Sequence, residues 1–236
     1  MAQSEAIEAA LGKLEDLRSR QVQNAKAMYD AYHGVWYAMD LFASAAINRS
    51  VALLSGFQTM IRGRNMICAG ALLRLQIDNA IRFYSAFIVP DPHRHVLDIL
   101  DGRRIDKMTD ECGKLMKDAY LIEKLSEEYP WLKRVYKETS GYIHLSHKHM
   151  MSAITGHNDT SRSIEVKISD LDKELPDWIY LEAIEAFLQT TRLFLKYLEG
   201  WIFTKANPEI VAEMKRKRDA ATASHDDGTT HNGQHP

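Results

Sequence analysis

Hydrophobic residues recur at intervals of three and four along most of the chain, which is the period of an amphipathic helix. This pattern predicts helices over residues 7–32, 35–54, 58–89, 121–150 with a break at Pro130, and 178–203. Gly56 is the expected end of the second helix, and the prolines of VPDP, which cannot continue a helix, end the third. The last helix is the clearest, because two apolar stripes give it the wide face of a bundle core.

One stretch departs from the helical period. The segment IEVKIS alternates with period 2 and predicts a short β element near residues 163–169, after a loop formed by TGHNDTSRS. The fold class that follows is all-α, a single up-and-down helical bundle of about five long helices in a domain spanning residues 1–210. Residues 211–236 are poor in apolar side chains and are expected to form a disordered polar tail.

Composition narrows the function classes only slightly. The net charge of -2 gives no global preference for nucleic acid or an anionic membrane. The two cysteines, Cys68 and Cys112, suit a reducing compartment, and no apolar run is long enough to span a bilayer, so we expect a cytoplasmic protein with no membrane partner. The chain has no P-loop, GxGxxG, GxSxG or HExxH motif, so neither a cofactor nor a metal site is predicted.

The segment SGYIHLSHKH carries the first candidate site. On a continuous helix, Ser140, His144 and His147 would share one face at successive turns, beside the core stripe of Ile143. Histidine titrates near neutral pH, which suits proton transfer. We expect the His144 ring to be buried and hydrogen-bonded to Asp78. The alternative is a polar stripe that ties this helix to its neighbour.

The segment LLRLQIDNAIRFY carries the second candidate. Arg74, Asp78 and Arg82 stand four residues apart on a helix whose apolar neighbours place it in the core. Asp78 can pair with either arginine, which would leave one guanidinium group to bind a phosphate or a carboxylate. The alternative is an ordinary ion-pair ladder on a helix surface.

The helix RNMICAGALLRLQIDNAIRFYSAFIV and the later segment VYKETSGYIHLSHKH resemble, over residues 60–200, HEPN-like helical proteins and abortive-infection-type bundles. The resemblance implies metal-independent RNA cleavage or RNA binding, in a stress or phage-defence role. His144 is not part of the family's Rx4-6H element, since the nearest arginine before it is Arg134. The resemblance therefore implies His144 as the acid or base and Arg74 or Arg82 as its partner, with Asp78, Ser140 and His147 as binding residues.

Two other functions fit the same residues. One is a non-catalytic helical module that binds a protein or itself, and the other is a sensor that uses the arginines to bind a small anion or a nucleotide. The nearly apolar second helix and the broad apolar face of the last helix also predict a homodimer. Catalysis requires His144 and an arginine to meet at an open cleft, whereas a structural clamp requires them to satisfy each other.

Overall fold

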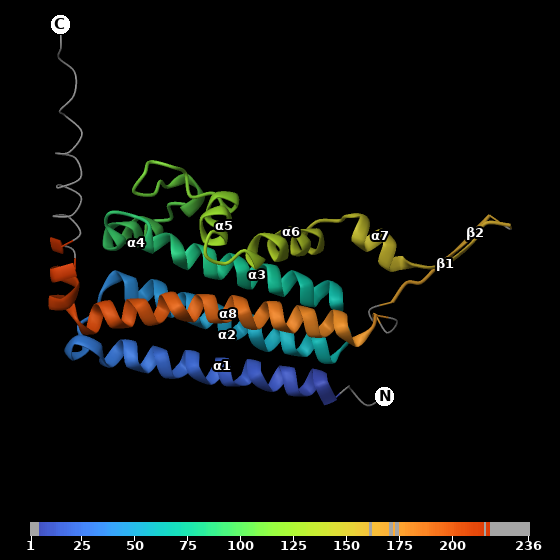
Figure 1. Cartoon of the computed structure of the whole chain (residues 1–236), viewed down its shortest axis with the longest axis horizontal. Helices are drawn as coiled ribbons and strands as arrows, with labels where there is room; N and C mark the ends of the chain where they lie inside the picture. Colours follow the sequence, from blue (N-terminus) through green and yellow to red (C-terminus); the bar gives the residue numbers. More distant parts are fainter. Residues whose placement is uncertain (1–4, 161, 170–171, 173–174, 215, 218–236) are drawn as a thin grey trace, which may run out of the picture.

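The computed structural model describes residues 5–160, 162–169, 172, 175–214 and 216–217, and most of these are helical (Figure 1). The α-helices and strands are α1 (Glu5–Asp30), α2 (Ala38–Arg62), α3 (Met66–Tyr84), α4 (Pro92–Leu100), α5 (Asp118–Ser126), α6 (Trp131–Ile143), α7 (His147–Ala153), β1 (Ile154–Asn158), β2 (Ser163–Val166) and α8 (Asp177–Ala206). Three short 3₁₀ turns, Ala31–Gly34, Ser85–Phe87 and Ile105–Lys107, lie between them.

Four long helices, α1, α2, α3 and α8, lie side by side and form the body of the protein (Figure 1). The shorter helices α4, α5 and α6 cover the outer side of this body, and α7 leads to the hairpin of β1 and β2 at one end. The all-α fold with a short β element is therefore confirmed. Four long helices are present in the described chain instead of about five, because residues 121–150 form three separate helices.

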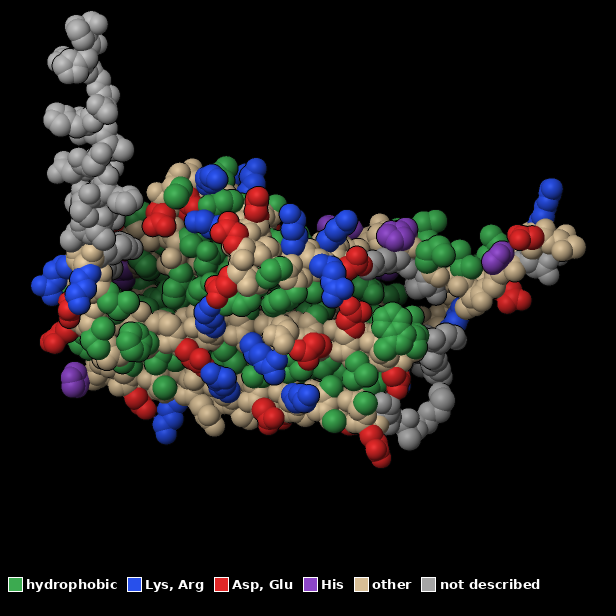
Figure 2. Space-filling view, viewed as in Figure 1, with side chains coloured by type: hydrophobic (Ala, Val, Ile, Leu, Met, Phe, Trp, Pro, Cys, Tyr) green, Lys and Arg blue, Asp and Glu red, His purple; other side chains and the backbone are tan. Residues whose placement is uncertain are grey.

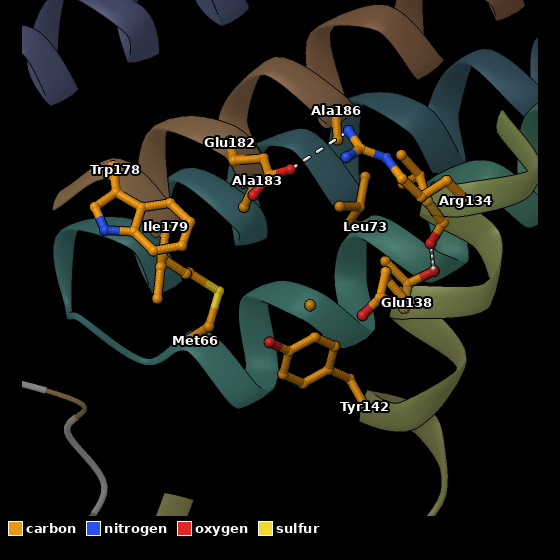
Figure 3. A pocket seen from close by; sticks show the side chains of 13 residues that line it. Met66, Leu73, Arg134, Glu138, Tyr142, Trp178, Ile179, Glu182, Ala183 and Ala186 are labelled. Carbon is orange, nitrogen blue, oxygen red and sulfur yellow. Dashed lines mark hydrogen bonds and ion pairs between the residues drawn. The ribbon is translucent and has the colours of Figure 1, made fainter. Parts of the chain in front are cut away.

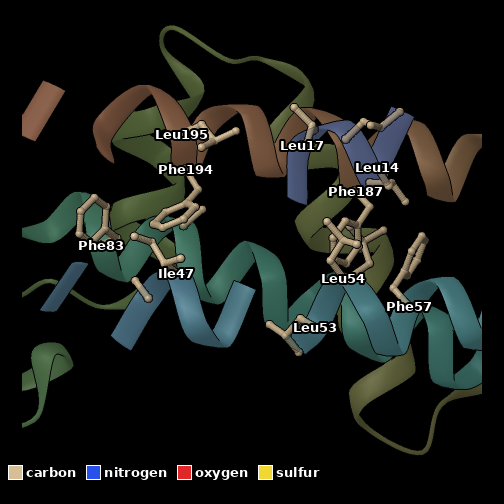
Figure 4. Packing of buried hydrophobic residues seen from close by; sticks show 14 of the residues in the cluster. Leu14, Leu17, Ile47, Leu53, Leu54, Phe57, Phe83, Phe187, Phe194 and Leu195 are labelled. Atoms are coloured by element: carbon tan, nitrogen blue, oxygen red, sulfur yellow. The ribbon is translucent and has the colours of Figure 1, made fainter. Parts of the chain in front are cut away.

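The main core lies between the four long helices. Figure 4 shows side chains of α1, α2, α3 and α8 meeting there. Phe57 of α2 stacks on Phe187 of α8 with ring centroids 4.3 Å apart, and Phe83 of α3 meets Phe194 edge-on at 5.2 Å. A second cluster lies on the other side of α3, where Ile77 packs with side chains of α5 and α6. Helix α3 is therefore covered from two sides.

The boundary between α2 and α3 differs from the prediction. Gly56 lies inside α2, where a Cβ atom would come within 3.3 Å of the Leu72 side chain, so this glycine permits close packing and does not end the helix. The turn instead occupies Gly63, Arg64 and Asn65. Arg64 has a φ of 53°, and the Asn65 side chain accepts a hydrogen bond from the Cys68 amide at 3.0 Å and caps α3.

The predicted continuous helix through Ser140 and His147 is also wrong. Helix α6 ends at Ile143, and His144 has an extended backbone with φ −113° and ψ 142°. The Ser146 hydroxyl donates to the Gly141 carbonyl at 2.8 Å, which satisfies an acceptor at the end of α6. A second correction concerns the expected loop at 155–163, most of which forms β1 and the turn of an antiparallel hairpin with β2.

The C-terminal part of the chain is described only in its first residues. Residues 208–214 are helical, so the predicted polar tail of 211–236 begins within a helical segment. The stretch from 218 to 236 lies outside the described residues.

A buried ion pair joins three of the long helices at one end of the bundle. Lys205 of α8 donates to the Asp40 carboxylate of α2 at 2.9 Å and to the Met28 carbonyl of α1 at 2.8 Å. Asp40 also accepts hydrogen bonds from the Trp201 indole at 2.8 Å and the Tyr37 amide at 2.9 Å. Both charged side chains are almost inaccessible to water. The pair therefore fixes where α1, α2 and α8 meet.

Replacing Lys205 with methionine should lower the free energy of unfolding by about 3 to 5 kcal/mol, because the Asp40 carboxylate would be left buried without its cation. Urea unfolding monitored by circular dichroism measures the change. Lys26→Met, at an exposed position of α1, is the matched control and should change stability little. Adding Asp40→Asn to Lys205→Met should restore part of the loss, and a double variant less stable than Lys205→Met would contradict this explanation.

Candidate functional site

An ion network spans α3, α2 and α5. Asp78 of α3 accepts hydrogen bonds from Arg49 of α2 at 2.9 Å and from Arg82, one turn further along α3, at 2.6 Å. Arg82 also donates to Asp118 of α5 at 2.8 Å. Burial opposes the charge on Arg82, but its contacts with Asp78 outweigh this effect and raise the pKa of Arg82 above its ordinary value. Arg82 is therefore a permanent cation with two carboxylate partners.

Arg74 is held differently from Arg82. Its guanidinium group lies over the Tyr136 ring of α6, with the central carbon 3.9 Å from the ring centroid, and its side chain is only 13% exposed. It forms an ion pair with Asp118 of α5, whose nearest carboxylate oxygen is 3.7 Å away, beyond hydrogen-bonding distance. Within the described chain Arg74 donates no hydrogen bond, although a guanidinium group has five N–H donors. Among the described residues, Arg74 thus keeps all of its N–H donors for a ligand, whereas Arg49 and Arg82 each donate at least one hydrogen bond to a carboxylate.

Arg74 lines a pocket of about 280 Å³ between α3 and α6. The structure brings four of the six predicted residues together there. The lining consists of Arg74, Leu75, Asp78, Tyr136, Ser140, Ile143 and His144. Arg82 lies outside this lining and supports it through Asp78. His147 lines a different hollow, of about 380 Å³, together with His149 and Tyr142.

The predicted link between His144 and Asp78 is wrong. His144 is exposed at the end of α6, and the Asp78 oxygens accept from Arg49 and Arg82 instead. The reason is that α6 ends at Ile143, so the extended backbone of His144 does not hold its ring on the helix face that carries Ser140. Ser140 does not orient His144 either, since its hydroxyl donates to the Tyr136 carbonyl at 2.8 Å. His144 is therefore a pocket-lining residue with an accessible ring, and not a buried clamp.

Sequence reasoning missed three members of this site. Arg49 and Asp118 come from other helices, and no local spacing connects them to Asp78 or Arg82. Tyr136 lies eight residues before His144, one turn before Ser140. The spacing between Tyr136 and Ser140 could have identified Tyr136 as a member of the site, because residues four apart on a helix lie on the same face.

A second, more apolar cleft lies on another face of α6, between α6 and α8 with α3 as its floor. Its volume is about 340 Å³. Figure 3 shows Trp178 and Tyr142 at its sides, Leu73 deep within it, and the ion pair of Arg134 with Glu182 across it. Hydrophobic side chains also gather along the seam between α8 and the shorter helices in Figure 2.

A serine–histidine pair elsewhere in the fold is enclosed. The Ser85 hydroxyl donates to the Arg82 carbonyl at 2.6 Å, so the His95 Nε2–H donates to Ser85 across 2.9 Å. Burial lowers the pKa of His95 to about 4, more than the neighbouring Asp98 carboxylate raises it. Both side chains are buried and neither lines one of the pockets described above. This pair links α4 to the end of α3 and offers no substrate access.

The described residues contain no group of three or more histidine, cysteine, aspartate or glutamate side chains arranged to hold a metal ion. None of the described helices is both long enough and apolar enough to cross a membrane.

Comparison with known proteins gives no relative: no protein-family model, no curated protein and no solved structure matches this chain.

His144→Ala should change the free energy of unfolding by less than about 0.5 kcal/mol, as at other exposed positions. Asp78→Ala should lower it by about 1 to 3 kcal/mol, because Arg49 and Arg82 would lose a partly buried acceptor. Thermal and urea unfolding of the two variants measure the difference. Equal destabilisation by the two changes would mean that His144 is a structural residue after all.

Proposed function

We propose that the protein binds RNA through a phosphate group held in the pocket between α3 and α6. The observation that carries this proposal is the state of Arg74, whose guanidinium group is fixed against Tyr136, faces a pocket and donates no hydrogen bond in the described chain. A guanidinium group held in this way can donate two parallel hydrogen bonds to phosphate oxygens.

The local charge supports an anionic ligand. Three guanidinium groups, from Arg49, Arg74 and Arg82, face two carboxylates, those of Asp78 and Asp118. The ion network beside the pocket therefore has one more guanidinium group than carboxylates, although the whole chain is slightly acidic. The Ser140 hydroxyl and the exposed His144 ring border the same pocket and add polar groups for a sugar or a phosphate. The aromatic ring of Tyr136 lies beneath the guanidinium group and limits its motion.

The same arrangement of Arg74 and His144 also supports metal-independent cleavage of the bound RNA. His144 would take the proton of a 2′-hydroxyl, whose oxygen then attacks phosphorus. Arg74 would stabilise the negative charge that develops on the phosphate oxygens. The bond to the 5′-oxygen breaks, and that oxygen takes a proton from water, which leaves a 2′,3′-cyclic phosphate and a 5′-hydroxyl. Of the two arginines suggested by the resemblance, Arg74 fits this role, because Arg82 is occupied by Asp78 and Asp118.

Arg74→Gln should weaken the binding of a fluorescein-labelled single-stranded RNA by about tenfold, the effect of losing one charge-assisted contact. Fluorescence anisotropy at fixed salt measures the affinity. The matched control is Arg103→Gln, which removes the same charge from an exposed loop arginine paired with Asp98. Incubation of the RNA with the protein in the presence of EDTA tests for metal-independent cleavage. His144→Ala should abolish this cleavage without unfolding the protein.

Three results of this experiment would contradict the proposed RNA site. Equal weakening by Arg103→Gln would show that binding depends on overall charge and not on the pocket. Binding of a mononucleotide with no binding of RNA would favour a small-anion sensor. The absence of any Arg74-dependent binding to RNA, nucleotide or inorganic phosphate would reject the pocket as an anion site.

A second proposal is self-association through the hairpin of β1 and β2. The apolar faces of α2 and α8 that predicted a homodimer are covered within the chain by α1 and α3. An uncovered apolar face lies on the hairpin instead. Ile164 and Val166 alternate along β2 and are 63% and 62% exposed, and Ile154 pairs opposite Val166. A two-stranded hairpin is marginally stable alone, and the same face of a second copy would cover it with a self-complementary surface.

The double change Ile164→Lys and Val166→Lys should convert a dimer to a monomer, because it places charges on that face. Light scattering coupled to size-exclusion chromatography measures the mass. Val22→Lys, at an exposed apolar position of α1, is the control and should leave the mass unchanged. A wild-type protein that is monomeric at micromolar concentration would reject the self-association proposal.

A further inference from the structure

The apolar cleft between α6 and α8 is a separate feature from the pocket of Arg74. The two hollows use different residues of α6: Arg134, Glu138 and Tyr142 border the cleft, whereas Tyr136 and Ser140 border the Arg74 pocket. Residues 134, 138 and 142 are four apart and share one helix face. A ligand in the cleft therefore does not depend on the proposed RNA site.

Small side chains keep this cleft open. Ala183 and Ala186 of α8 border it where α8 faces α6, and Leu73 of α3 lies within it. Gly70 of α3 also borders it, and a Cβ atom at this position would lie 2.4 Å from the Tyr142 ring. The glycine therefore allows the Tyr142 ring to approach the backbone of α3 closely and form one wall of the cleft.

Aromatic and sulfur-containing side chains surround the opening. Trp178 is 62% exposed although it borders an apolar cavity, and Figure 3 shows it across the cavity from Tyr142, with Met66 between them. Aromatic rings favour stacked or edge-on contacts with other rings, and a thioether also packs well against a ring. The volume of about 340 Å³ is near the lower end of the range for small-molecule sites, about 300 to 1,000 Å³.

The charges at the rim restrict the ligand further. Arg134 and Glu182 form an ion pair at 3.5 Å that crosses from α6 to α8, and Glu138 stands one turn after Arg134. The rim therefore has one more carboxylate than guanidinium groups, which disfavours an anion. Both members of the ion pair are mostly exposed, so opening it costs little free energy.

We infer that the cleft between α6 and α8 binds a small planar aromatic molecule, of one or two fused rings, that carries no negative charge. Its ring packs against the wall formed by Trp178, Met66 and Tyr142. It also contacts Leu73 and the alanines of α8. The ion pair of Arg134 and Glu182 closes over its edge.

Binding of 1-aminonaphthalene to the full chain tests this inference, with equilibrium dialysis as the measurement and the rise in probe fluorescence as a second readout. We expect saturable binding to one site per chain. Ala183→Leu, which fills the cleft, should weaken it by about tenfold or more, since overfilled apolar space cannot take the ring without strain. Ala45→Leu, at an exposed position of α2, is the matched control and should bind as the wild type does.

Further variants and a second probe distinguish a loss of probe binding from a loss of folding. Trp178→Ala removes an exposed side chain at the cleft and should weaken binding while the thermal melt stays unchanged. Naphthalene-1-sulfonate, which has the same rings and a negative charge, should bind more weakly than 1-aminonaphthalene. Arg74→Gln should leave probe binding unchanged, which separates this site from the RNA proposal. No saturable binding to the wild type, or equal binding by Ala183→Leu and Ala45→Leu, would overturn the inference.

Discussion

Burial of α3 from two sides is the constraint on which the rest of the structure depends. A central helix must provide partners for every polar side chain that it removes from water. Gln76 donates to Ser50 of α2 at 2.7 Å and to Thr191 of α8 at 3.2 Å, and Asn79 donates to the Ala46 carbonyl at 3.0 Å. These bonds join α3 to its long neighbours. The polar residues of α3 thereby determine which helices can lie beside it.

The charged stripe of α3 follows from the same constraint. Arg74, Asp78 and Arg82 lie where the main body gives way to the shorter helices, so α2 and α5 provide the opposite charges. Arg82 and Asp78 are hydrogen-bonded in this way, but Arg74 meets an aromatic ring and an ion-pair partner, Asp118, that is 3.7 Å away. A functional role is consistent with this difference, because partly buried arginines are usually hydrogen-bonded as fully as their surroundings allow.

Helix α6 creates both hollows of interest because it lies along α3 without filling the space beside it. One face leaves the polar pocket of Arg74, and another leaves the apolar cleft beside α8. Gly70 permits the close approach of Tyr142 that fixes α6 on this surface. The two hollows therefore border one short helix, and its position on α3 determines the shape of both.

The sequence by itself determined the helical class, the long final helix and the break before Pro92, because periodic apolar faces and prolines act locally. It also placed Arg74, Asp78 and Arg82 on one helix face. Only the tertiary structure decided that Gly56 serves packing, that α6 ends before His144, and that Arg49 and Asp118 pair with the stripe. These features depend on contacts between residues far apart in the chain, and local spacing carries no information about which surfaces meet. The exposure of His144 and the two hollows beside α6 were decided in the same way, by how completely neighbouring helices fill the space around α3.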